Sequence, residues 1–441
     1  MHVPRLMVER VPVEPIVGNS KPMTEVPEFL TPTSEHRARK NGRAQVTQVF
    51  VTNITLLDTV SSPRHEEEHI RLQHRLQRSR GKWDSVHPRQ RLLTALHGFT
   101  KYKERNLVET KRWRDLYKQV SKRQRSLVES TVHYTRKLNA VEHLLEINEQ
   151  LAKAIVTQGL QFYNVSRSEL DEFIRQQEQE GQATDRTSVS QAMKHFVRDW
   201  AEEGSEERQE AFPCVLSTLE RIPRTSEQPL RVLVPGAGVG RLAHEIDGLR
   251  GFEVTMNEWS AYMNLVYRYM SSISTPNSEA FHPYIDWWSH HATTRDLQRS
   301  VAFPDRVIDP SSVLLVEGDF TTVFAEDTGK YDMIVTLFFI DTARNLVSYF
   351  ETIHQLLRPG GRWINLGPLL YGSAPFLQLS LDEIIALSEK IGFQFEETDP
   401  SCGDITLTDS PVRGLEVAYG RNGRGLSKNA YQAQFWQATK L

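Results

Sequence analysis

The chain has 441 residues, of which 39% are hydrophobic and 25% charged, as is ordinary for a soluble globular protein. That length is too great for one compact core, so we expect two structural units or one unit with a large extension. Lys and Arg number 53 against 56 Asp and Glu, a formal net charge of -3. This balance excludes a global field that would attract nucleic acid or anionic lipid.

Cysteine is rare, since Cys214 and Cys402 are the only two in the chain. They could form one disulfide, but so low a count suits a reducing compartment and excludes a Cys-rich zinc module. No stretch approaches the roughly 18–20 apolar residues of a membrane span, and residues 1–21 lack the apolar core of a signal peptide. We therefore expect no membrane association and a cytoplasmic location, with the nucleus as the alternative.

The amino-terminal half falls into two segments of different composition. Residues 1–80 begin rich in Pro, Thr, Ser and charge, and only residues 48–60 are apolar enough for a strand or a short docked segment. We predict that this segment is largely disordered or loosely docked. Residues 81–225 carry apolar side chains at helical intervals, which predicts a helical extension with two or three long helices between residues 88 and 162.

Short β-rich runs alternate with helical patterns from Leu230 onward, beginning with RVLVPG and FEVTMNE and ending with GRWINLG and LDEIIALSEKIGF. Such alternation of apolar strands with helices is typical of a parallel sheet covered on both faces. We predict a doubly wound α/β domain over residues 226–441.

A glycine-rich turn follows the first of these strands. Gly236, Gly238 and Gly240 stand in PGAGVGR, between the strand and a helix. Glycines let the backbone turn tightly and approach a ligand closely. The pattern alone does not decide between cofactors, because nicotinamide and flavin enzymes share it and many such turns bind nothing.

Later motifs narrow the cofactor. Glu258 ends the next strand about 20 residues after the glycines, where a carboxylate can accept hydrogen bonds from both ribose hydroxyls, although a solvated strand end is the alternative. Asp319 ends a later strand, where it can bind an adenine amino group while Phe320 covers the ring. The turn LRPGG before the fifth strand is common in class I methyltransferases and unusual in dehydrogenases. Together the motifs predict S-adenosyl-L-methionine as cofactor and the class I methyltransferase fold, a Rossmann-like, seven-stranded, mostly parallel sheet.

Asp341 is the candidate catalytic residue, because it follows the fourth strand at the carboxyl edge of the sheet, where ligands bind. Methyl transfer is an in-line displacement that requires an oriented neutral nucleophile and exclusion of water. Asp341 could orient an acceptor N–H or take its proton, and a helix N-cap is the alternative role. We expect no metal site, and surface or packing roles for the adjacent His290 and His291.

These motifs resemble the carnosine N-methyltransferase family. The resemblance is carried by KHFVRDW, VLVPGAGVGRLAHEI, NEWS, GDF, FFIDTARN and LLRPGGRWINLGPLLY, over roughly Val189 to Leu441. FFIDTA followed by GGRWINLGPLLY is more specific than any general methyltransferase motif. The upstream helices fit the family's helical extension more loosely.

Carried over position by position, the resemblance implies a set of cofactor contacts. Arg198 would bind the cofactor's carboxylate from a helix outside the α/β domain, which would make the helical extension a lid. Asp341 corresponds to the family's substrate aspartate, which binds one imidazole nitrogen and leaves the other free to attack. His195 stands where the family usually has Gln. The implied cofactor residues are Arg198, His195, Gly236, Gly238, Gly240, Glu258, Asp319 and Phe320.

The sequence departs from the family where the acceptor is chosen. Gly372 stands where the family usually has His, and Ile405 where it has Tyr. Tyr431 survives from the family's tyrosine cluster, and Tyr419 lies in an inserted Gly/Arg-rich stretch. We expect Tyr371 and Tyr431 to contact the substrate, in a pocket altered away from carnosine.

The sequence therefore predicts an S-adenosylmethionine-dependent N-methyltransferase that acts on a small molecule or small peptide, with an imidazole nitrogen as the leading acceptor. The first alternative is a specialised-metabolite N- or O-methyltransferase, and the second is a non-catalytic adaptor that retains the fold. A nicotinamide oxidoreductase would need a hydride-relay residue that the sequence lacks. A homodimer is expected, whereas nucleic acid is not, because the basic residues near 65–91 are mixed with acidic ones.

Overall fold

A computed structural model of the chain describes residues 5–10, 52–57, 62–182, 185–225, 227–372, 374–420 and 422–441. The chain divides into two compact units, Met1–Thr59 and Val60–Leu441. In the first unit, β1 (Arg5–Arg10) pairs antiparallel with β2 (Thr52–Leu57). The strand expected within residues 48–60 is thus present over its described part.

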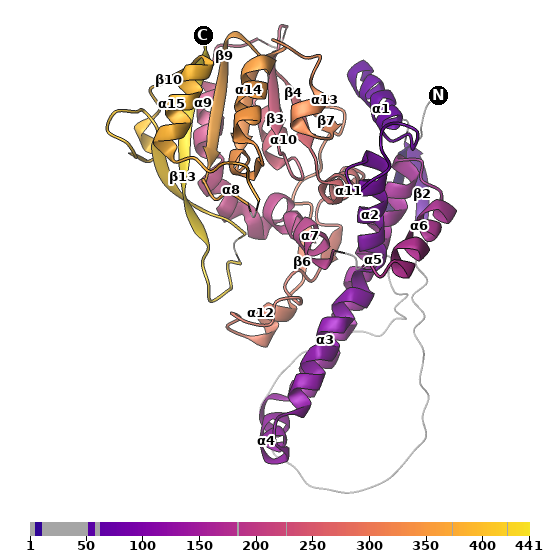
Figure 1. The fold of residues 1–441 in the computed structure, drawn as a ribbon. Coiled ribbons are helices and arrows are strands. Elements are labelled where there is room, and N and C mark those ends of the chain that lie inside the picture. The colour runs from indigo at the N-terminus through magenta and orange to yellow at the C-terminus, as the bar shows by residue number, and fades with distance from the viewer. Residues whose placement is uncertain are drawn as a thin grey trace, which may run out of the picture. The chain divides into compact units, whose positions relative to one another are not determined.

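The second unit begins with helices (Figure 1). They are α1 (Pro63–Arg75), α2 (Pro88–Thr100), α3 (Tyr102–Lys118), α4 (Lys122–Val132), α5 (Tyr134–Phe162), α6 (Arg167–Gln179), α7 (Arg186–Trp200), η1 (Glu202–Gly204), α8 (Ser205–Ala211) and α9 (Pro213–Glu220). Four helices rather than two or three occupy residues 88–162. One extra break lies at Ser121, which starts α4 with a capping box, and another at His133, whose φ of 51° is left-handed.

The packing of these helices follows their apolar spacing. In α5, the longest helix that the structure describes, Leu138, Val141 and Leu145 recur every three or four residues and are buried. In α1, Leu72 is 4% exposed and belongs to the main core cluster, so this helix is docked. The remainder of the predicted disordered or loosely docked segment stays a prediction.

One large sheet organises the rest of the unit, with strand order β11-β12-β13-β9-β8-β3-β4-β7 and β10 paired to β13. Its strands are β3 (Leu230–Pro235), β4 (Phe252–Glu258), β7 (Leu314–Glu317), β8 (Tyr331–Leu337), β9 (Leu357–Gly367), β10 (Phe393–Glu396), β11 (Asp404–Ile405), β12 (Arg413–Ala418) and β13 (Ala430–Lys440). β7, β4, β3, β8 and β9 are parallel, whereas β13 and β10 join antiparallel. These seven strands confirm the predicted class I methyltransferase sheet, and β11 and β12 extend it.

Helices cover both faces of this sheet. They are α10 (Arg241–Gly248), α11 (Ala261–Met270), α13 (Phe320–Val323), α14 (Leu346–Leu356) and α15 (Leu381–Ile391), with α12 (Thr294–Gln298) and the short pair β5 (Glu279–Phe281) and β6 (Val301–Phe303) in a connecting segment. Val232 in β3 packs in the same core cluster as Ile246 of α10, whereas its neighbour Leu233 packs in a second cluster with Phe350 of α14. Consecutive strand residues point to opposite faces, so each face has its own core.

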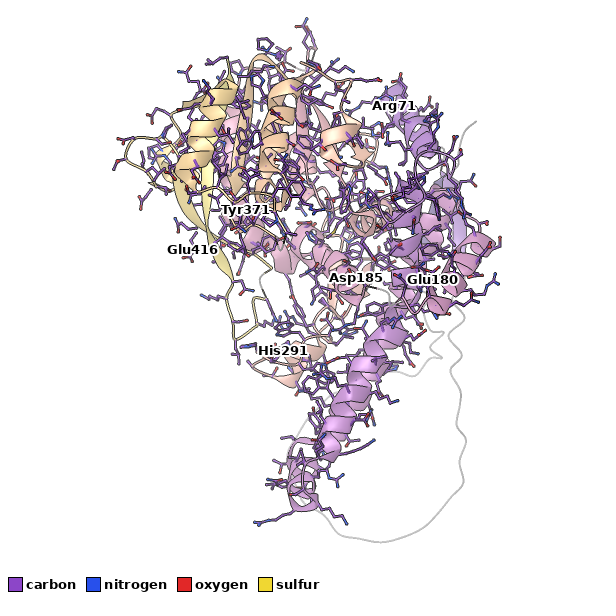
Figure 2. All side chains as sticks on the ribbon, in the orientation of Figure 1. Arg71, Glu180, Asp185, His291, Tyr371 and Glu416 are labelled. Carbon is purple, nitrogen blue, oxygen red and sulfur yellow. A yellow bond between two sulfur atoms is a disulfide. The ribbon has the colours of Figure 1, made fainter. Side chains whose placement is uncertain are left out.

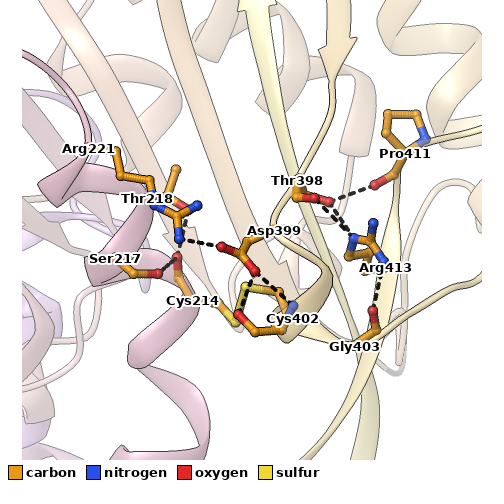
Figure 3. Close-up of a disulfide and its surroundings, with 11 residues drawn as sticks. Cys214, Ser217, Thr218, Arg221, Thr398, Asp399, Cys402, Gly403, Pro411 and Arg413 are labelled. Atoms are coloured by element: carbon orange, nitrogen blue, oxygen red, sulfur yellow. Dashed lines mark hydrogen bonds and ion pairs between the residues drawn. A yellow bond between two sulfur atoms is a disulfide. The ribbon is translucent and has the colours of Figure 1, made fainter.

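A disulfide joins the helical region to the carboxy-terminal strands (Figure 3). Cys214 in α9 and Cys402 in the 3₁₀ turn η3 (Pro400–Cys402) are bonded, with their Cα atoms 5.6 Å apart. Both are buried, and an ion pair between Arg221 and Asp399 lies beside them. Disulfides are uncommon in reducing compartments, so this bond argues against using the cysteine count to assign the compartment.

Among the helices of the described residues, none has the length and apolar character that crossing a membrane requires.

Candidate active site

The glycine turn lies at the carboxyl end of β3 and leads into α10. Gly236, Gly238 and Gly240 have φ of 64°, 58° and 80°, the left-handed region that glycine adopts without strain. A Cβ added at Gly236 would lie 2.2 Å from Cδ2 of Phe339, whereas one at Gly238 would meet the ring of His195 at 3.5 Å. Gly236 is therefore required for close packing, whereas a Cβ at Gly238 would only come into ordinary contact with His195.

Glu258 is bound directly to this turn. Its Oε2 accepts a 2.9 Å hydrogen bond from the Gly238 backbone N–H, and its Oε1 accepts a 2.7 Å bond from the Ser260 N–H. Burial raises the pKa of the Glu258 carboxyl, although these backbone hydrogen bonds oppose the effect. The alternative of a solvated strand-end Glu is wrong. Each oxygen keeps a lone pair that a ligand hydroxyl could use.

Helix α7 brings His195 to the same place. His195 Nδ1 lies 3.0 Å from Oδ2 of Asp199, one turn along the helix. Burial alone would raise the pKa of Asp199, but the hydrogen bond from His195 and the nearby arginines outweigh it and lower that pKa. The Trp200 indole N–H donates a 2.9 Å bond to the carbonyl of Val239, which fixes the end of α7 against the glycine turn.

Arg198 follows His195 by three residues on α7, and its Nε lies 3.7 Å from the other carboxylate oxygen of Asp199. The same Nε lies 3.0 Å from Oε1 of Glu207, and the guanidinium carbon lies 4.5 Å from the centroid of the Tyr419 ring. Burial would lower the pKa of Arg198, but Asp199, Tyr419 and Glu207 outweigh it and raise that pKa. Arg198 is thus a fixed positive charge between α7 and the segment after β12.

Asp319 and Phe320 start α13, after β7. Oδ1 of Asp319 accepts hydrogen bonds from the backbone N–H of Thr321 at 2.9 Å and from its hydroxyl at 2.7 Å, so Asp319 caps the helix. Phe320 is 3% exposed and contacts Phe339 and Tyr349 edge-on, with centroids 5.5 and 5.6 Å away. Cofactor contacts of Asp319 and Phe320 stay predictions.

Asp341 lies in a 3₁₀ turn, η2 (Ile340–Thr342), after β8. Its Oδ2 accepts a 3.3 Å hydrogen bond from the backbone N–H of Leu370, which follows β9, and no helix-capping bond from η2 ends on it. The alternative of a helix N-cap is therefore wrong. Asp341 is 7% exposed, and burial raises the pKa of its carboxyl to about 6. A carboxyl tuned toward neutral pH at the carboxyl edge of the sheet is suited to proton or hydrogen-bond chemistry.

The two tyrosines predicted to contact the substrate have different partners in the structure. Tyr371 follows Leu370 and donates a 2.7 Å hydrogen bond from its hydroxyl to the carbonyl of Leu379. Burial raises the pKa of Tyr371, and the carboxylate of Asp341 adds to the effect. Tyr431, in β13, has its ring centroid 6.1 Å from that of Phe338, the residue that follows β8. Tyr371 thus adjoins Leu370, the residue whose backbone N–H donates to Asp341. Tyr431 instead contacts the Phe338 ring.

Sequence reasoning missed Arg91. This residue of α2 places its guanidinium carbon 3.5 Å from the ring centroid of Trp259 and donates a hydrogen bond to the Trp259 carbonyl. Burial lowers the pKa of Arg91 to about 10, while the carboxylates of Glu258 and Asp319 oppose that shift. Arg91 thus lies within the field of two predicted cofactor residues. Its only sequence signal is a basic residue in a helix with no spacing relation to the later motifs.

Asp305 was missed as well. Its carboxylate accepts 2.7 Å hydrogen bonds from Arg208 and from Arg241, the first residue of α10. The same two arginines donate to the backbone carbonyls of Arg198 and Asp199, each at 2.8 Å. Asp305 therefore clamps the end of α7 to the helix that follows the glycine turn.

The adjacent histidines lie at or near the surface: the His290 side chain is exposed and that of His291 is half-buried. His291 Nε2 lies 2.6 Å from the carbonyl of Trp287, and the backbone of His291 forms a β-bridge with Gly425. Across the described residues, no group of three or more His, Cys, Asp or Glu side chains could hold a metal ion.

Comparison with known proteins identifies the family. The family model described as carnosine N-methyltransferase matches residues 175–441. The chain belongs to this family. The match confirms the prediction made from the motifs, and the predicted enzyme class, an S-adenosylmethionine-dependent methyltransferase, is the class of this family.

Curated proteins similar to this chain carry the name of the same family. The carnosine N-methyltransferase of Mus musculus is 36% identical over 244 residues, which cover 51% of this chain and 59% of the mouse protein. That of Schizosaccharomyces pombe is 31% identical over 297 residues, 61% of this chain and 77% of the yeast protein. The matched part of the chain thus spans 59% of the length of the mouse and rat relatives.

Solved structures are less similar in sequence to this chain than the curated relatives are. Haemonchus contortus phosphoethanolamine N-methyltransferase 2, in complex with S-adenosyl-L-methionine, overlaps 49% of this chain and 45% of its own at 14% identity. The TM-score of 0.30 is too low to carry an argument.

Proposed function

We propose that the chain transfers a methyl group from S-adenosylmethionine to a nitrogen of a small acceptor, with an imidazole-bearing molecule or peptide as the leading substrate. The observation that carries this proposal is the hydrogen bond between the Gly238 N–H and Glu258, since it joins the two motifs expected to hold the adenosine part of the cofactor. Family membership supports the same chemistry.

The residues present fit this cofactor. Gly238 carries no Cβ, and one placed there would touch the His195 ring at 3.5 Å, so the backbone of the turn can be approached closely by a ligand. Glu258 has acceptor capacity for ribose hydroxyls, and Arg198 is a buried cation suited to a carboxylate. When bound, S-adenosylmethionine supplies an electrophilic methyl group on a sulfonium. The other candidate contacts are His195, Gly236, Gly240, Asp319 and Phe320.

Asp341 is the residue that we propose binds the methyl acceptor. Its pKa of about 6 leaves it mostly ionised at neutral pH, so its carboxylate can accept a hydrogen bond from an imidazole N–H. The second imidazole nitrogen then keeps its lone pair for attack on the methyl group. Exclusion of water is supported by the burial of Asp341 beneath the backbone of Leu370.

A different acceptor is the second candidate, because the pocket departs from the family. A Cβ at Gly372 would meet nothing within 4 Å, so the position usually taken by a family histidine is open. Ile405 is 45% exposed where the family has Tyr. These differences favour an acceptor other than carnosine, which includes the specialised-metabolite N- or O-acceptors.

Mass spectrometry of acceptors tests the proposal. The protein is incubated with S-adenosylmethionine and, separately, with carnosine, L-histidine and small cyclic histidine peptides. We expect at least one imidazole compound to gain the mass of one CH₂ group, and the Asp341→Asn variant to abolish that gain. Methylation of none of them by a protein that binds the cofactor would contradict an imidazole acceptor.

We also propose three properties of the whole chain. They are the homodimer, the cytoplasmic location, and the division into an amino-terminal segment (1–80), a helical lid (81–225) and a methyltransferase domain (226–441). Size-exclusion chromatography with light scattering tests the first.

A further inference from the structure

Residues 111–137 form a segment that the structure describes throughout and in which no residue is buried. This segment, here called the arm tip, comprises the end of α3, all of α4 and the start of α5. The last buried residue of α3 is Thr110, and the first of α5 is Leu138. In Figure 1, α4 lies at the far end of the arm that α3 and α5 form, and Figure 2 shows side chains that extend outward there. The surface of the arm tip is therefore accessible to a partner.

The arm tip is strongly basic. It has nine Lys or Arg residues and two acidic residues, a net charge of +7 in a chain whose formal net charge is -3. Three of the cations form ion pairs, which are Arg112 with Glu109, Arg114 with Glu142 and Lys118 with Asp115. The other six form no ion pair with any residue that the structure describes, and they are Lys111, Lys122, Arg123, Arg125, Arg136 and Lys137. The acidic balance of the whole chain thus conceals a local positive field.

Three aliphatic side chains are exposed among these cations. The exposed fractions are 42% for Leu116, 66% for Leu127 and 62% for Val132. Leu127 and Val132 belong to α4, which has no buried residue, although a helix on a globular protein ordinarily buries an apolar stripe. Exposed aliphatic groups beside Lys and Arg on a short helix are typical of segments that bind at the surface of an anionic membrane.

The aromatic rings of the arm tip are engaged within the protein. Tyr117 packs on Tyr134 with ring centroids 4.7 Å apart, and Trp113 packs on Trp288 with centroids 6.1 Å apart. Surfaces that hold single-stranded nucleic acid need free aromatic faces for the bases, and a phosphate backbone has no apolar layer in which Leu127 could be buried. A symmetric contact with a second copy would bring like charges together, which is unfavourable. These observations favour an anionic lipid surface over either partner.

We propose that the arm tip is a docking surface for an anionic membrane. In this arrangement the six free cations face the lipid headgroups, and Leu127 and Val132 of α4 enter the boundary between headgroups and acyl chains. The expectation of no membrane association came from the lack of a long apolar run, which does not detect a short peripheral surface. The inference is independent of methyl transfer, because the arm tip shares no residue with the candidate active site.

Co-sedimentation of the full chain with lipid vesicles tests the proposal. Vesicles of phosphatidylcholine alone are compared with vesicles of phosphatidylcholine and phosphatidylserine in equal parts, at low and at physiological ionic strength. One variant combines Lys122→Gln, Arg123→Gln and Arg136→Gln, which removes three free cations, and a second variant is Leu127→Ser. Circular dichroism checks the folding of each variant.

A third variant is the matched control for charge. It combines Arg175→Gln, Arg250→Gln and Lys390→Gln, and so removes the same charge from exposed positions outside the arm tip. None of these three residues forms an ion pair with a described residue. A loss of binding in the arm-tip variant alone therefore reports position and not net charge.

We expect the wild type to bind the vesicles that contain phosphatidylserine and not those of phosphatidylcholine alone, with an affinity that falls as salt is raised. The triple variant of the arm tip should bind about tenfold or more weakly, because each cation near an anionic surface contributes to the affinity. The control should stay within about twofold of the wild type. Leu127→Ser should weaken binding by about threefold or more, since it removes an apolar side chain from the lipid boundary.

Binding of the wild type to both kinds of vesicle alike, or to neither, would overturn the inference. So would an arm-tip variant that binds as the control does. Unchanged affinity in Leu127→Ser would show that the arm tip responds to charge alone, which contradicts insertion into lipid. Tighter binding to polyuridylate or to polyglutamate than to the vesicles would assign the surface to RNA or to an acidic protein instead. Self-association that Leu127→Ser abolishes, measured by light scattering, would assign it to a second copy.

Discussion

The backbone N–H of Gly238 donates a 2.9 Å hydrogen bond to Oε2 of Glu258. The glycine turn after β3 and the carboxylate at the end of β4 are thereby one structural unit rather than two adjacent motifs. Because β3 and β4 pair in parallel register, with Pro235 opposite Asn257, their ends meet at the same edge of the sheet. The position of the acid is thus set by backbone pairing, before any ligand binds.

Alanine at the two glycines should separate packing from backbone conformation. Gly236→Ala should lower the free energy of unfolding by about 3 kcal/mol or more, because it combines left-handed φ with overlap against Phe339. Gly238→Ala should cost about 1–2 kcal/mol, since its Cβ would lie 3.5 Å from His195 and only the backbone is strained. Urea unfolding of both variants measures the difference. Equal losses would contradict the packing that we describe.

Asp341 should give the protein a pH-dependent stability. Its pKa in the folded protein is about 6, above the ordinary value of 3.8, so burial favours the neutral form. The stabilisation relative to an ionised carboxylate is full below pH 3.8 and is lost as pH rises through about 6. Asp341→Asn should therefore raise the melting temperature at pH 8 and change it little at pH 4.5. Methyl transfer by the wild type should rise as pH passes 6.

Thermal melts at both pH values check this prediction, with Asp332→Asn as the control. Asp332 is the second residue of β8, at the end of the strand away from Asp341, and it pairs with Arg358. A stabilisation of Asp341→Asn that is the same at pH 4.5 and pH 8 would show that the Asp341 carboxyl titrates normally.

Arg91 should contribute to cofactor affinity although it lies in α2, before the family match begins at residue 175. Arg91→Ala removes the cation stacked on Trp259 and a positive charge near Glu258 and Asp319, so we expect S-adenosylmethionine binding to weaken by about three- to tenfold. Arg89→Ala is the matched control, because Arg89 lies on the same helix but pairs with Glu169. Isothermal titration with S-adenosylmethionine measures the affinity of both variants. Equal losses of affinity would contradict a specific role for Arg91.

The disulfide should stabilise the fold. Cys214 and Cys402 are 188 residues apart, so reduction releases a long loop and should cost about 2–5 kcal/mol. Urea unfolding with and without a thiol reductant measures this cost. The double variant Cys214→Ser with Cys402→Ser should unfold as the reduced protein does and should not respond to reductant. Unchanged stability of the wild type on reduction would contradict the bond.

The parts of the fold that follow from local pattern were predictable. Alternation of apolar strands and helices after Leu230 predicted the parallel sheet, and the glycine turn followed by Glu258 predicted their neighbourhood, because parallel strands end at one edge. The family assignment followed from a resemblance, because FFIDTA and GGRWINLGPLLY are more specific than any general methyltransferase motif.

Contacts between distant segments were not predictable. Arg91 reaches Trp259 across 168 residues, so no local spacing indicates this pair. The two cysteines, 188 residues apart, could be named as a possible disulfide because the chain has no others, but their spacing does not show that they are neighbours. The breaks that divide the long helices lie at Ser121 and His133, where capping and a left-handed residue outweigh apolar spacing. The β11–β12 extension escaped prediction because its short strands lack a sustained alternation.

Calorimetric titration of S-adenosylmethionine into the wild type and the Glu258→Gln variant tests the central claim most directly. Glu253→Gln, on the same strand but half-exposed beside Arg231, is the control. We predict saturable binding to the wild type and the control, and a loss of about tenfold or more in Glu258→Gln, because hydrogen bonds to a carboxylate lose their charge assistance. Absence of binding to the wild type, or equal affinity of Glu258→Gln, would contradict the cofactor site described here.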